Sequence, residues 1–270
     1  MKDLNARTLA TELADLHLPA VRFYQATGST NDEAITWAEH GAPDWALVVA
    51  DEQTAGRGRT GRRWITPPGS ALAFSLILRP RPAELPYLAR ATALGALAVC
   101  QALFTEYGLD AQVKWPNDVL VSRRKLAGVL AETQWNGAQP TALVLGIGIN
   151  VATAFLGTEV LNYPATCVAA GLGSVPDRLE LLHAVLKAMI DWRPRLGSPS
   201  FMSAWENALA YRNQWVLLAP GDGSGAMIEG LVLGLTLDGA LRLKNRQDKE
   251  IIVNVGELRL AGDLAQTAGE

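Results

Sequence analysis

A segment rich in glycine and arginine, TAGRGRTGRRW, covers residues 54–64 and has the composition of an anion-binding loop. Three glycines within six residues let backbone N–H groups converge on a negative charge, because no Cβ atom obstructs them. Each arginine can donate paired hydrogen bonds to a phosphate or a carboxylate. The residues concerned are Gly56, Gly58, Gly61, Arg57, Arg59, Arg62 and Arg63. Four cations without compensating charge also predict that this arginine-glycine loop is mobile until an anion binds, and becomes ordered with it.

The glycine spacing matches the G-x-G-x-x-G turn of dinucleotide-binding proteins, but the surroundings of the loop do not. That turn needs a following helix, whose N-terminus meets the pyrophosphate. Pro67, Pro68 and Gly69 follow the loop and argue against such a helix. The customary acidic residue of a second strand is also missing, since Glu84 lies in a proline-rich connector. A dinucleotide site is not expected, and the loop alone does not distinguish an anion site from a solvated basic loop.

The elements around the loop predict an α+β domain, with a mixed β-sheet packed with helices. A strand over 46–52 leads into the loop, and a strand over 71–80 follows it. A helix over 31–40 begins after a Gly-Ser-Thr turn, with Thr30 as its cap. Apolar periodicity predicts the remaining elements: a long helix over 85–107, a hairpin of strands over 113–121 and 126–135, a neighbouring strand over 142–151, and helices over 178–192 and 198–212.

The character of the sequence changes after residue 213. Short β-prone runs alternate there with glycine-rich turns such as GDGSG and LDGA. We therefore expect two domains, a catalytic domain over 1–212 and a small all-β barrel over 213–270.

Composition bounds the class of protein. The 270 residues are 49% hydrophobic and 19% charged, with a formal net charge of −3, as in an ordinary soluble globular protein. This charge argues against a protein whose main role is to coat nucleic acid. Acidic residues interrupt the N-terminal region where a secretory signal would need an apolar run, and we expect no membrane span.

Cysteine and histidine usage excludes other classes. Cys100 and Cys167 lie far apart in apolar settings, which predicts buried thiols and a cytoplasmic protein without disulfides. His17, His40 and His183 show no metal-ligand spacing, so the metal ligands stay unknown. No G-x-S-x-G motif marks a triad hydrolase.

Five segments, taken together, resemble the biotin protein ligases. They are GSTNDEA (28–34), EQTAGRGRTGRRW (52–64), KWPNDV (114–119), RKLAGVLAE (124–132) and GIGINV (146–151), in the order and spacing of that family. The C-terminal β-rich region is likewise similar to the Src-homology-3-like domain of these ligases. The resemblance implies that biotin and ATP, with Mg²⁺, give biotinyl-5′-AMP, and that biotin then passes to a lysine of the biotin carboxyl carrier domain of an acyl-CoA carboxylase.

The resemblance also implies roles for individual residues. Ser29, Thr30 and Asn31 would bind the ureido head of biotin, although Ser29 or Thr30 could equally cap the helix. Gln53 would complete the ureido contacts with its amide. The other residues of the biotin site would be Arg57, Gly58, Arg59 and Lys125.

Two of these are expected to act on the reacting centre. Arg59 would hold the α-phosphate, and Lys125 would be the central cation beside the α-phosphate and the biotin carbonyl. A lysine in a hairpin turn is by itself most often solvated, so Lys125 rests on the family resemblance. The same centre would include Arg57, which closes over the mixed anhydride.

The nucleotide would be held by residues of three segments. Trp64 would pack on adenine, with a place in the core as the alternative. Asn117 and Asp118 would contact ATP, and Asp118 could also bind Mg²⁺. Asn150 would pair with the adenine edge. The glycines before Asn150 would let the backbone approach the ligand, with a β-bulge as the alternative.

Three alternatives follow from the same residues. Some members of the family carry an N-terminal winged helix-turn-helix of about 60 residues; only 27 residues precede Gly28, so we expect no DNA binding. A lipoate or octanoate protein ligase would share the architecture, but the arginine-rich form of the loop favours biotin. A non-enzymatic RNA-binding module is disfavoured by the net charge and by the lack of interleaved aromatic residues.

Overall fold

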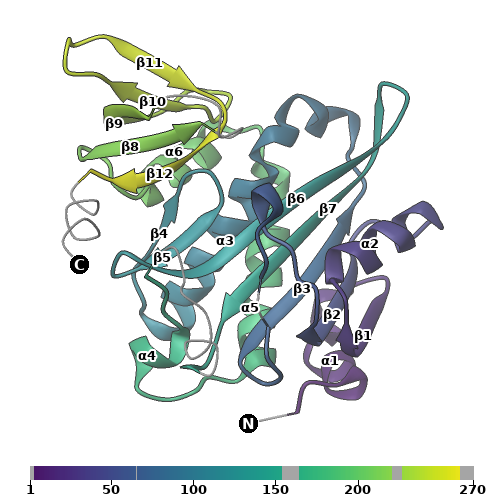
Figure 1. Cartoon of the computed structure of the whole chain (residues 1–270). Coiled ribbons are helices and arrows are strands. Elements are labelled where there is room, and N and C mark those ends of the chain that lie inside the picture. Colours follow the sequence, from purple (N-terminus) through teal and green to yellow (C-terminus); the bar gives the residue numbers. More distant parts are fainter. Residues whose placement is uncertain (1–2, 65, 154–163, 221–226, 262–270) are drawn as a thin grey trace.

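The larger part of the protein is built on a seven-stranded mixed sheet. The structure is a computed structural model, and it describes residues 3–64, 66–153, 164–220 and 227–261. The strand order is β1-β2-β3-β7-β6-β5-β4, in which only β1 and β2 are parallel (Figure 1). The strands are β1 (Val21–Thr27), β2 (Ala46–Gln53), β3 (Ala71–Leu78), β4 (Ala111–Lys114), β5 (Asp118–Val121), β6 (Arg124–Asn136) and β7 (Gln139–Asn150).

Helices cover both faces of this sheet. The α-helices are α1 (Ala6–Glu12), α2 (Thr30–Glu39), α3 (Ala91–Tyr107), α4 (Val168–Leu172), α5 (Arg178–Trp192) and α6 (Pro199–Ala208). Leu47 and Val49 of β2 point into the main core with α3 and α5, whereas Val48 points toward α2, where Ala34 lies. A strand buried on both faces reads as a continuous apolar run, which explains the sequence ALVVA in β2.

A separate antiparallel sheet follows the last helix. Its order is β11-β10-β9-β8-β12. The strands are β8 (Trp215–Pro220), β9 (Ile228–Leu235), β10 (Leu241–Lys244), β11 (Glu250–Val253) and β12 (Gly256–Leu260). Within the described residues β11 and β12 are the two edges, and no strand pairing closes the sheet between them. The predicted α+β class with a separate all-β part is confirmed, and the boundary at residues 212 and 213 stays a proposal.

Hydrogen bonds at the turn between β9 and β10 and at the end of β9 join this smaller sheet to the rest of the protein. Trp115 Nε1 donates a hydrogen bond of 3.0 Å to the carbonyl of Gly239 in the turn between β9 and β10. Arg90 donates to the carbonyl of Leu237 in the same turn at 2.5 Å. Glu206 of α6 accepts from the backbone N–H of Leu235 at 3.0 Å.

Several predicted elements have different limits. The helix expected over 85–107 begins as a 3-10 segment, Pro82–Arg90, and becomes α-helical at Ala91, because Pro86 has no N–H to donate. The strand expected over 113–121 is two strands, β4 and β5, which pair with each other around a bend at Pro116. The helix expected over 198–212 ends at Ala208.

One helical segment of the described residues has the length and composition of a candidate membrane span, although the sequence analysis expected none. Among the described residues, Pro82–Tyr107 is long and apolar enough to cross a membrane by length and composition. Its most apolar window is 67% buried inside the protein, as is usual for a core helix.

Candidate functional site

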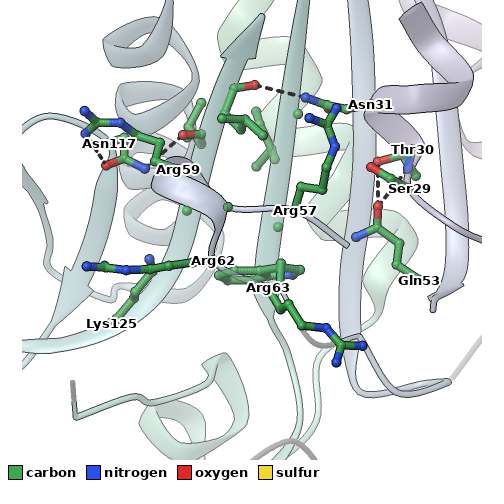
Figure 2. A pocket seen from close by; sticks show the side chains of 18 residues that line it. Ser29, Thr30, Asn31, Gln53, Arg57, Arg59, Arg62, Arg63, Asn117 and Lys125 are labelled. Atoms are coloured by element: carbon green, nitrogen blue, oxygen red, sulfur yellow. Dashed lines mark hydrogen bonds between the residues drawn. The ribbon is translucent and has the colours of Figure 1, made fainter. Parts of the chain in front are cut away.

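A pocket lies between the arginine-glycine loop and the sheet strands β6 and β7 (Figure 2). Ten of the predicted site residues line it: Ser29, Thr30, Asn31, Gln53, Arg57, Gly58, Arg59, Trp64, Asn117 and Lys125. Asp118 and Asn150 do not line it. All five motif segments therefore contribute to one pocket, as the motif pattern predicts.

The N-terminus of α2 forms one side of the pocket. Ser29, not Thr30, is the N-cap residue, and its side chain makes no capping hydrogen bond, so the predicted cap is wrong. Thr30 is turned instead toward Gln53 at the end of β2. Its backbone N–H and its hydroxyl donate to Gln53 Oε1 at 2.7 and 3.0 Å. This pair fixes the Gln53 amide with its oxygen toward α2 (Figure 2).

The side chain of Asn31 is hydrogen-bonded to other side chains of the protein. Its Nδ2 donates to Glu132 Oε2 at 2.7 Å, and its Oδ1 accepts from the hydroxyl of Ser75 at 2.6 Å. A Cβ atom at Gly146 of β7 would lie 2.0 Å from Asn31 Oδ1. The first glycine of the GIG sequence is thus needed to admit the Asn31 side chain. The pairing of β7 with β3 shows no register shift there, so the alternative of a bulge is wrong.

The arginine-glycine loop is folded back on itself and over the pocket. Two backbone hydrogen bonds hold it in this shape: Trp64 N–H donates to the carbonyl of Gly56 at 2.8 Å, and Gly58 N–H donates to the carbonyl of Arg62 at 2.7 Å. A short 3-10 turn, Arg59–Gly61, lies between these bonds, and the described residues between this turn and β3 contain no α-helix, as predicted.

Acidic residues from three other segments compensate the charge of this loop. Arg57 forms two hydrogen bonds with Glu132, at 2.9 and 2.8 Å, and an ion pair with Asp32 at 2.7 Å. Arg62 is paired through both terminal nitrogens with Glu257 of β12. The expectation of uncompensated cations is wrong for Arg57 and Arg62, because their carboxylate partners lie far from the loop in the sequence.

The side of the pocket near β5 carries a cluster of alternating charges. Lys125 Nζ lies 2.5 Å from one carboxylate oxygen of Asp118, and Lys114 Nζ lies 3.7 Å from the other. Arg59 donates to Asn117 Oδ1 at 3.2 Å. Burial lowers the pKa values of both Arg59 and Lys114, and the charge of Asp118 only partly offsets this effect. Burial removes water from these cations. An anion that binds between them is therefore favoured, because it replaces the lost interactions with water.

Trp64 closes the pocket on the β7 side. A Cβ atom at Gly148 would lie 2.3 Å from Trp64 Cε2, and one at Gly128 would lie 3.4 Å from its Cζ3. The second glycine of GIG therefore admits an indole ring rather than a ligand directly. Lys125 Nζ lies 5.6 Å from the centroid of the same ring, within the range of a cation–π contact.

Asn150 lies apart from the other predicted residues. It is buried, and its Nδ2 donates to the carbonyl of Thr166 at 3.0 Å. Its predicted contact with an adenine edge stays a prediction, and in this geometry Asn150 fixes the segment that follows residue 163.

Two residues that hold the side chain of Asn31 were not predicted. Glu132 lies at the end of an apolar run, LAGVLAE, and Ser75 interrupts the apolar strand AFSLIL. An isolated polar residue in a buried apolar run needs a hydrogen-bonding partner, and this pattern in the sequence could have marked both residues as structurally important. Neither residue could be paired with Asn31 before the sheet order was known.

The described residues contain no group of three His, Cys, Asp or Glu side chains placed to hold a metal ion. Asp118, the predicted Mg²⁺ contact, already has two ammonium groups on its carboxylate. The donor set does not fit a resident metal site, and Asp118 is better described as the counter-ion of the two lysines.

Together, the polar and cationic groups of the pocket suit a small molecule with a hydrogen-bonding head and an anionic end. The polar groups of α2 and Gln53 suit the head, and the cations around Asp118 suit the anion. The pocket is closed by a loop that carries further arginines.

Comparison with known proteins identifies the family. Residues 25–150 match the biotin/lipoate A/B protein ligase family. A biotin–[acetyl-CoA-carboxylase] ligase of Paracoccus denitrificans is 34% identical over 233 residues, which cover 84% of this chain and 95% of that protein. The bifunctional ligase/repressor BirA of Bacillus subtilis (strain 168) is 40% identical over 184 residues, which cover 66% of this chain and 54% of that protein, so the match spans about half of its length.

The fold is shared over nearly the whole chain. The solved structure of a biotin protein ligase from Aquifex aeolicus in complex with biotin and ATP is 30% identical, with a TM-score of 0.75, and the match covers 90% of this chain and 99% of that one. The chain belongs to the biotin/lipoate A/B protein ligase family, and the resemblance to biotin protein ligases noted in the sequence is confirmed.

Proposed function

We propose that this protein is an ATP-dependent ligase that joins biotin to a lysine of a biotin carboxyl carrier domain of an acyl-CoA carboxylase. The observation that carries the proposal is the pocket, in which a polar head site and a cluster of cations lie under one arginine-glycine loop. A relative named biotin–[acetyl-CoA-carboxylase] ligase, matched over 95% of its length, supports it.

In the first half-reaction, a carboxylate oxygen of biotin attacks the α-phosphorus of ATP. The bond from that phosphorus to the bridging oxygen breaks, and pyrophosphate leaves with the electron pair. Lys125 and Arg59 would stabilise the negative charge that grows on the α-phosphate, because their charges are already fixed there by Asp118 and Asn117. Ser29, Thr30 and Gln53 would orient the ureido head.

In the second half-reaction, the neutral amine of the carrier lysine attacks the acyl carbon of biotinyl-5′-AMP. The bond from that carbon to the phosphate oxygen breaks, AMP leaves, and the amine loses a proton. Arg57, Gly58 and Arg59 would cover the mixed anhydride and keep water from it. Trp64 would pack beside the adenosine part, with Asn117, Asp118 and Asn150 as further nucleotide contacts.

We propose that Mg²⁺ arrives with ATP as part of the substrate, since magnesium in nucleotide sites is held largely by phosphates and water. Both cysteines are unpaired and buried, in keeping with a cytoplasmic enzyme. We propose no DNA partner and no membrane.

The alternatives are less well supported. The named relatives that cover most of this chain are biotin ligases, which favours biotin over lipoate or octanoate. An RNA-binding module would need a loop whose cations face solvent, whereas Arg57 and Arg62 are paired with carboxylates.

The deciding experiment is the incubation of the protein with biotin, ATP, Mg²⁺ and a carrier domain, followed by mass spectrometry of the carrier. We expect the carrier to gain the mass of one biotinyl group on one lysine. A carrier that stays unmodified with biotin, but gains a lipoyl or octanoyl group from the matching acid, would contradict the proposal.

A further inference from the structure

The arginine-glycine loop reverses its direction through one tight turn. Arg62 N–H donates to the carbonyl of Arg59 at 3.2 Å, so the two central residues of the turn are Thr60 and Gly61. Both have a positive φ, 54° for Thr60 and 74° for Gly61. Two left-handed residues closed by such a hydrogen bond form a type I′ turn, the turn that most often joins two antiparallel strands. The folded form of the loop is therefore a short hairpin.

Thr60 is an unfavourable residue for this turn. Type I′ turns favour Asn or Asp followed by Gly, because these residues tolerate the left-handed region. Gly61 meets this requirement, whereas Thr60 is β-branched, and its Cβ substituents crowd the backbone when φ is positive. The hydroxyl of Thr60 donates to the carbonyl of Arg59 at 2.7 Å, which offsets part of this cost. The folded form of the loop thus contains one strained residue.

A second turn of the same kind shows how such strain is supported elsewhere in the chain. Ser122 and Arg123, with φ values of 50° and 62°, join β5 to β6. The strands on both sides of that turn belong to the seven-stranded sheet. The hairpin around Thr60 has instead an isolated bridge between Arg57 and Arg63. Because a strained residue persists where the surrounding structure over-determines it, the strain at Thr60 opposes its own hairpin more effectively.

The turn determines where two arginines of the pocket point. Arg59 precedes Thr60 and donates to Asn117 at 3.2 Å, and Arg62 follows the turn and pairs with Glu257. Thr60 itself is exposed and does not line the pocket. Its side chain therefore acts on the site through the backbone conformation of the turn.

We propose that Thr60 is a positioning residue whose strain weakens the folded form of the arginine-glycine loop and so limits how long a ligand is retained beneath it. A ligand that contacts Arg59 favours the folded form, and the strain at Thr60 opposes it. The identity of the retained ligand as biotinyl-5′-AMP rests on the proposed function. The strain of the turn does not, because it depends on the backbone of the chain alone.

Two substitutions of Thr60 change the strain in different ways. T60N introduces a residue that tolerates the left-handed region, whereas T60V keeps the branched Cβ and loses the hydrogen bond to the carbonyl of Arg59. We expect T60N to release biotinyl-5′-AMP about three- to tenfold more slowly than the wild type, and T60V to release it at least as fast. Release is followed by chromatography in the absence of carrier. Equal release from T60N and the wild type would overturn the proposal, as would slower release from T60V.

S122N is the matched control. It places asparagine at the first central position of the turn between β5 and β6, and Ser122 is exposed and does not line the pocket. Its release of biotinyl-5′-AMP should equal that of the wild type. Release that slows in S122N as much as in T60N would show that general stabilisation controls retention, and the proposal would be wrong.

Hydrogen exchange tests the turn without any ligand. The amides of Gly58 and Trp64 donate the two backbone hydrogen bonds of the hairpin, and neither is adjacent to residue 60, so their intrinsic exchange is the same in all variants. In the protein without added ligand, exchange detected by NMR should be slower in T60N than in the wild type at both amides, and no slower in T60V. Equal rates in T60N and the wild type would contradict the proposal. A wild type that forms no biotinyl-5′-AMP would contradict the proposed function, while the exchange rates would still decide the role of Thr60.

Discussion

At the scale of single residues, Lys125 is the cation best placed to act on a reacting phosphate. It projects from the start of β6 to Asp118 and Trp64, and both contacts keep its ammonium at the pocket. A charge held in place before the reaction stabilises the transition state without reorganisation, which distinguishes it from a mobile surface lysine.

Lys125→Gln should therefore lower the rate of biotinyl transfer by about 10²–10³-fold, the usual loss for one charge-stabilising donor. The neighbouring Arg124→Gln is the matched control, because Arg124 is exposed and outside the pocket, and its rate should be unchanged. Carrier biotinylation at saturating biotin and ATP measures both. Near-normal transfer by Lys125→Gln would remove Lys125 from the mechanism.

The proposed function gives Arg59 a different role, which is retention of the intermediate. Arg59→Ala should release biotinyl-5′-AMP on the order of ten- to a hundredfold faster, as for the loss of one hydrogen bond to a charged group. Arg63→Ala should show a smaller change, since Arg63 donates only a long bond of 3.4 Å to the carbonyl of Thr54. Release is measured by chromatography of biotinyl-5′-AMP in the absence of carrier. Wild-type retention by Arg59→Ala would refute the assignment.

At the scale of elements, β7 is shaped by the side chains that cross it. Gly146 and Gly148 occupy places where a methyl group would overlap Asn31 and Trp64, respectively. These glycines do not interrupt the strand, because its ladders to β3 and β6 continue through both of them. The absence of a Cβ atom at each leaves room for the side chains of Asn31 and Trp64.

Gly148→Ala should consequently displace the Trp64 indole and weaken ligand binding strongly, while the fold persists. Gly128→Ala, directly opposite on β6, is the matched control, because its methyl group would meet Trp64 at an ordinary contact distance of 3.4 Å. We expect a loss in biotin affinity of at least about tenfold for the first variant, corresponding to about 1.4 kcal/mol, and a clearly smaller loss for the second. Calorimetric titration distinguishes them, and equal affinities would show that Trp64 tolerates the change.

The sequence predicts which helices and strands exist more accurately than it predicts where they begin and end or which side chains pair. The strands before and after the loop follow from apolar runs, and the pocket residues follow from five collinear segments. The run over 113–121 was predicted as one strand, because its pattern of apolar residues continues across Pro116. In the structure the chain bends at Pro116, and the run forms two strands. The partners of Arg57 and Arg62 lie 75 and 195 residues away, so their compensation depends on the sheet arrangement, which a single sequence does not display.

At the scale of the whole molecule, the two sheets are joined by polar contacts at a shared turn. Trp115 and Arg90 both donate to the turn between β9 and β10, and a buried donor that loses its acceptor is costly, by about 1–3 kcal/mol. The smaller sheet is therefore firmly joined to the rest of the protein. Its β12 strand also supplies the partner of a pocket arginine.

We accordingly expect the two parts to unfold in one cooperative transition. Differential scanning calorimetry should give a single peak, with equal calorimetric and van't Hoff enthalpies. The variant Trp115→Phe, which keeps an aromatic ring but removes the N–H donor and part of the indole, should lower the transition temperature. Two separate peaks in the wild type would show that the contacts at the turn are too weak to couple the sheets.

The pairing of Arg62 with Glu257 has a consequence for biosynthesis. The two residues are separated by 195 positions, so at about 5–20 residues per second the loop leaves the ribosome about 10–40 s before its C-terminal counter-ion exists. During that interval the nascent chain can complete β1 to β7 but not this closure of the pocket. A ribosome that stalls within the last few codons before Glu257 would thus leave a chain that contains the residues lining the pocket but lacks the acid of β12 that pairs with Arg62.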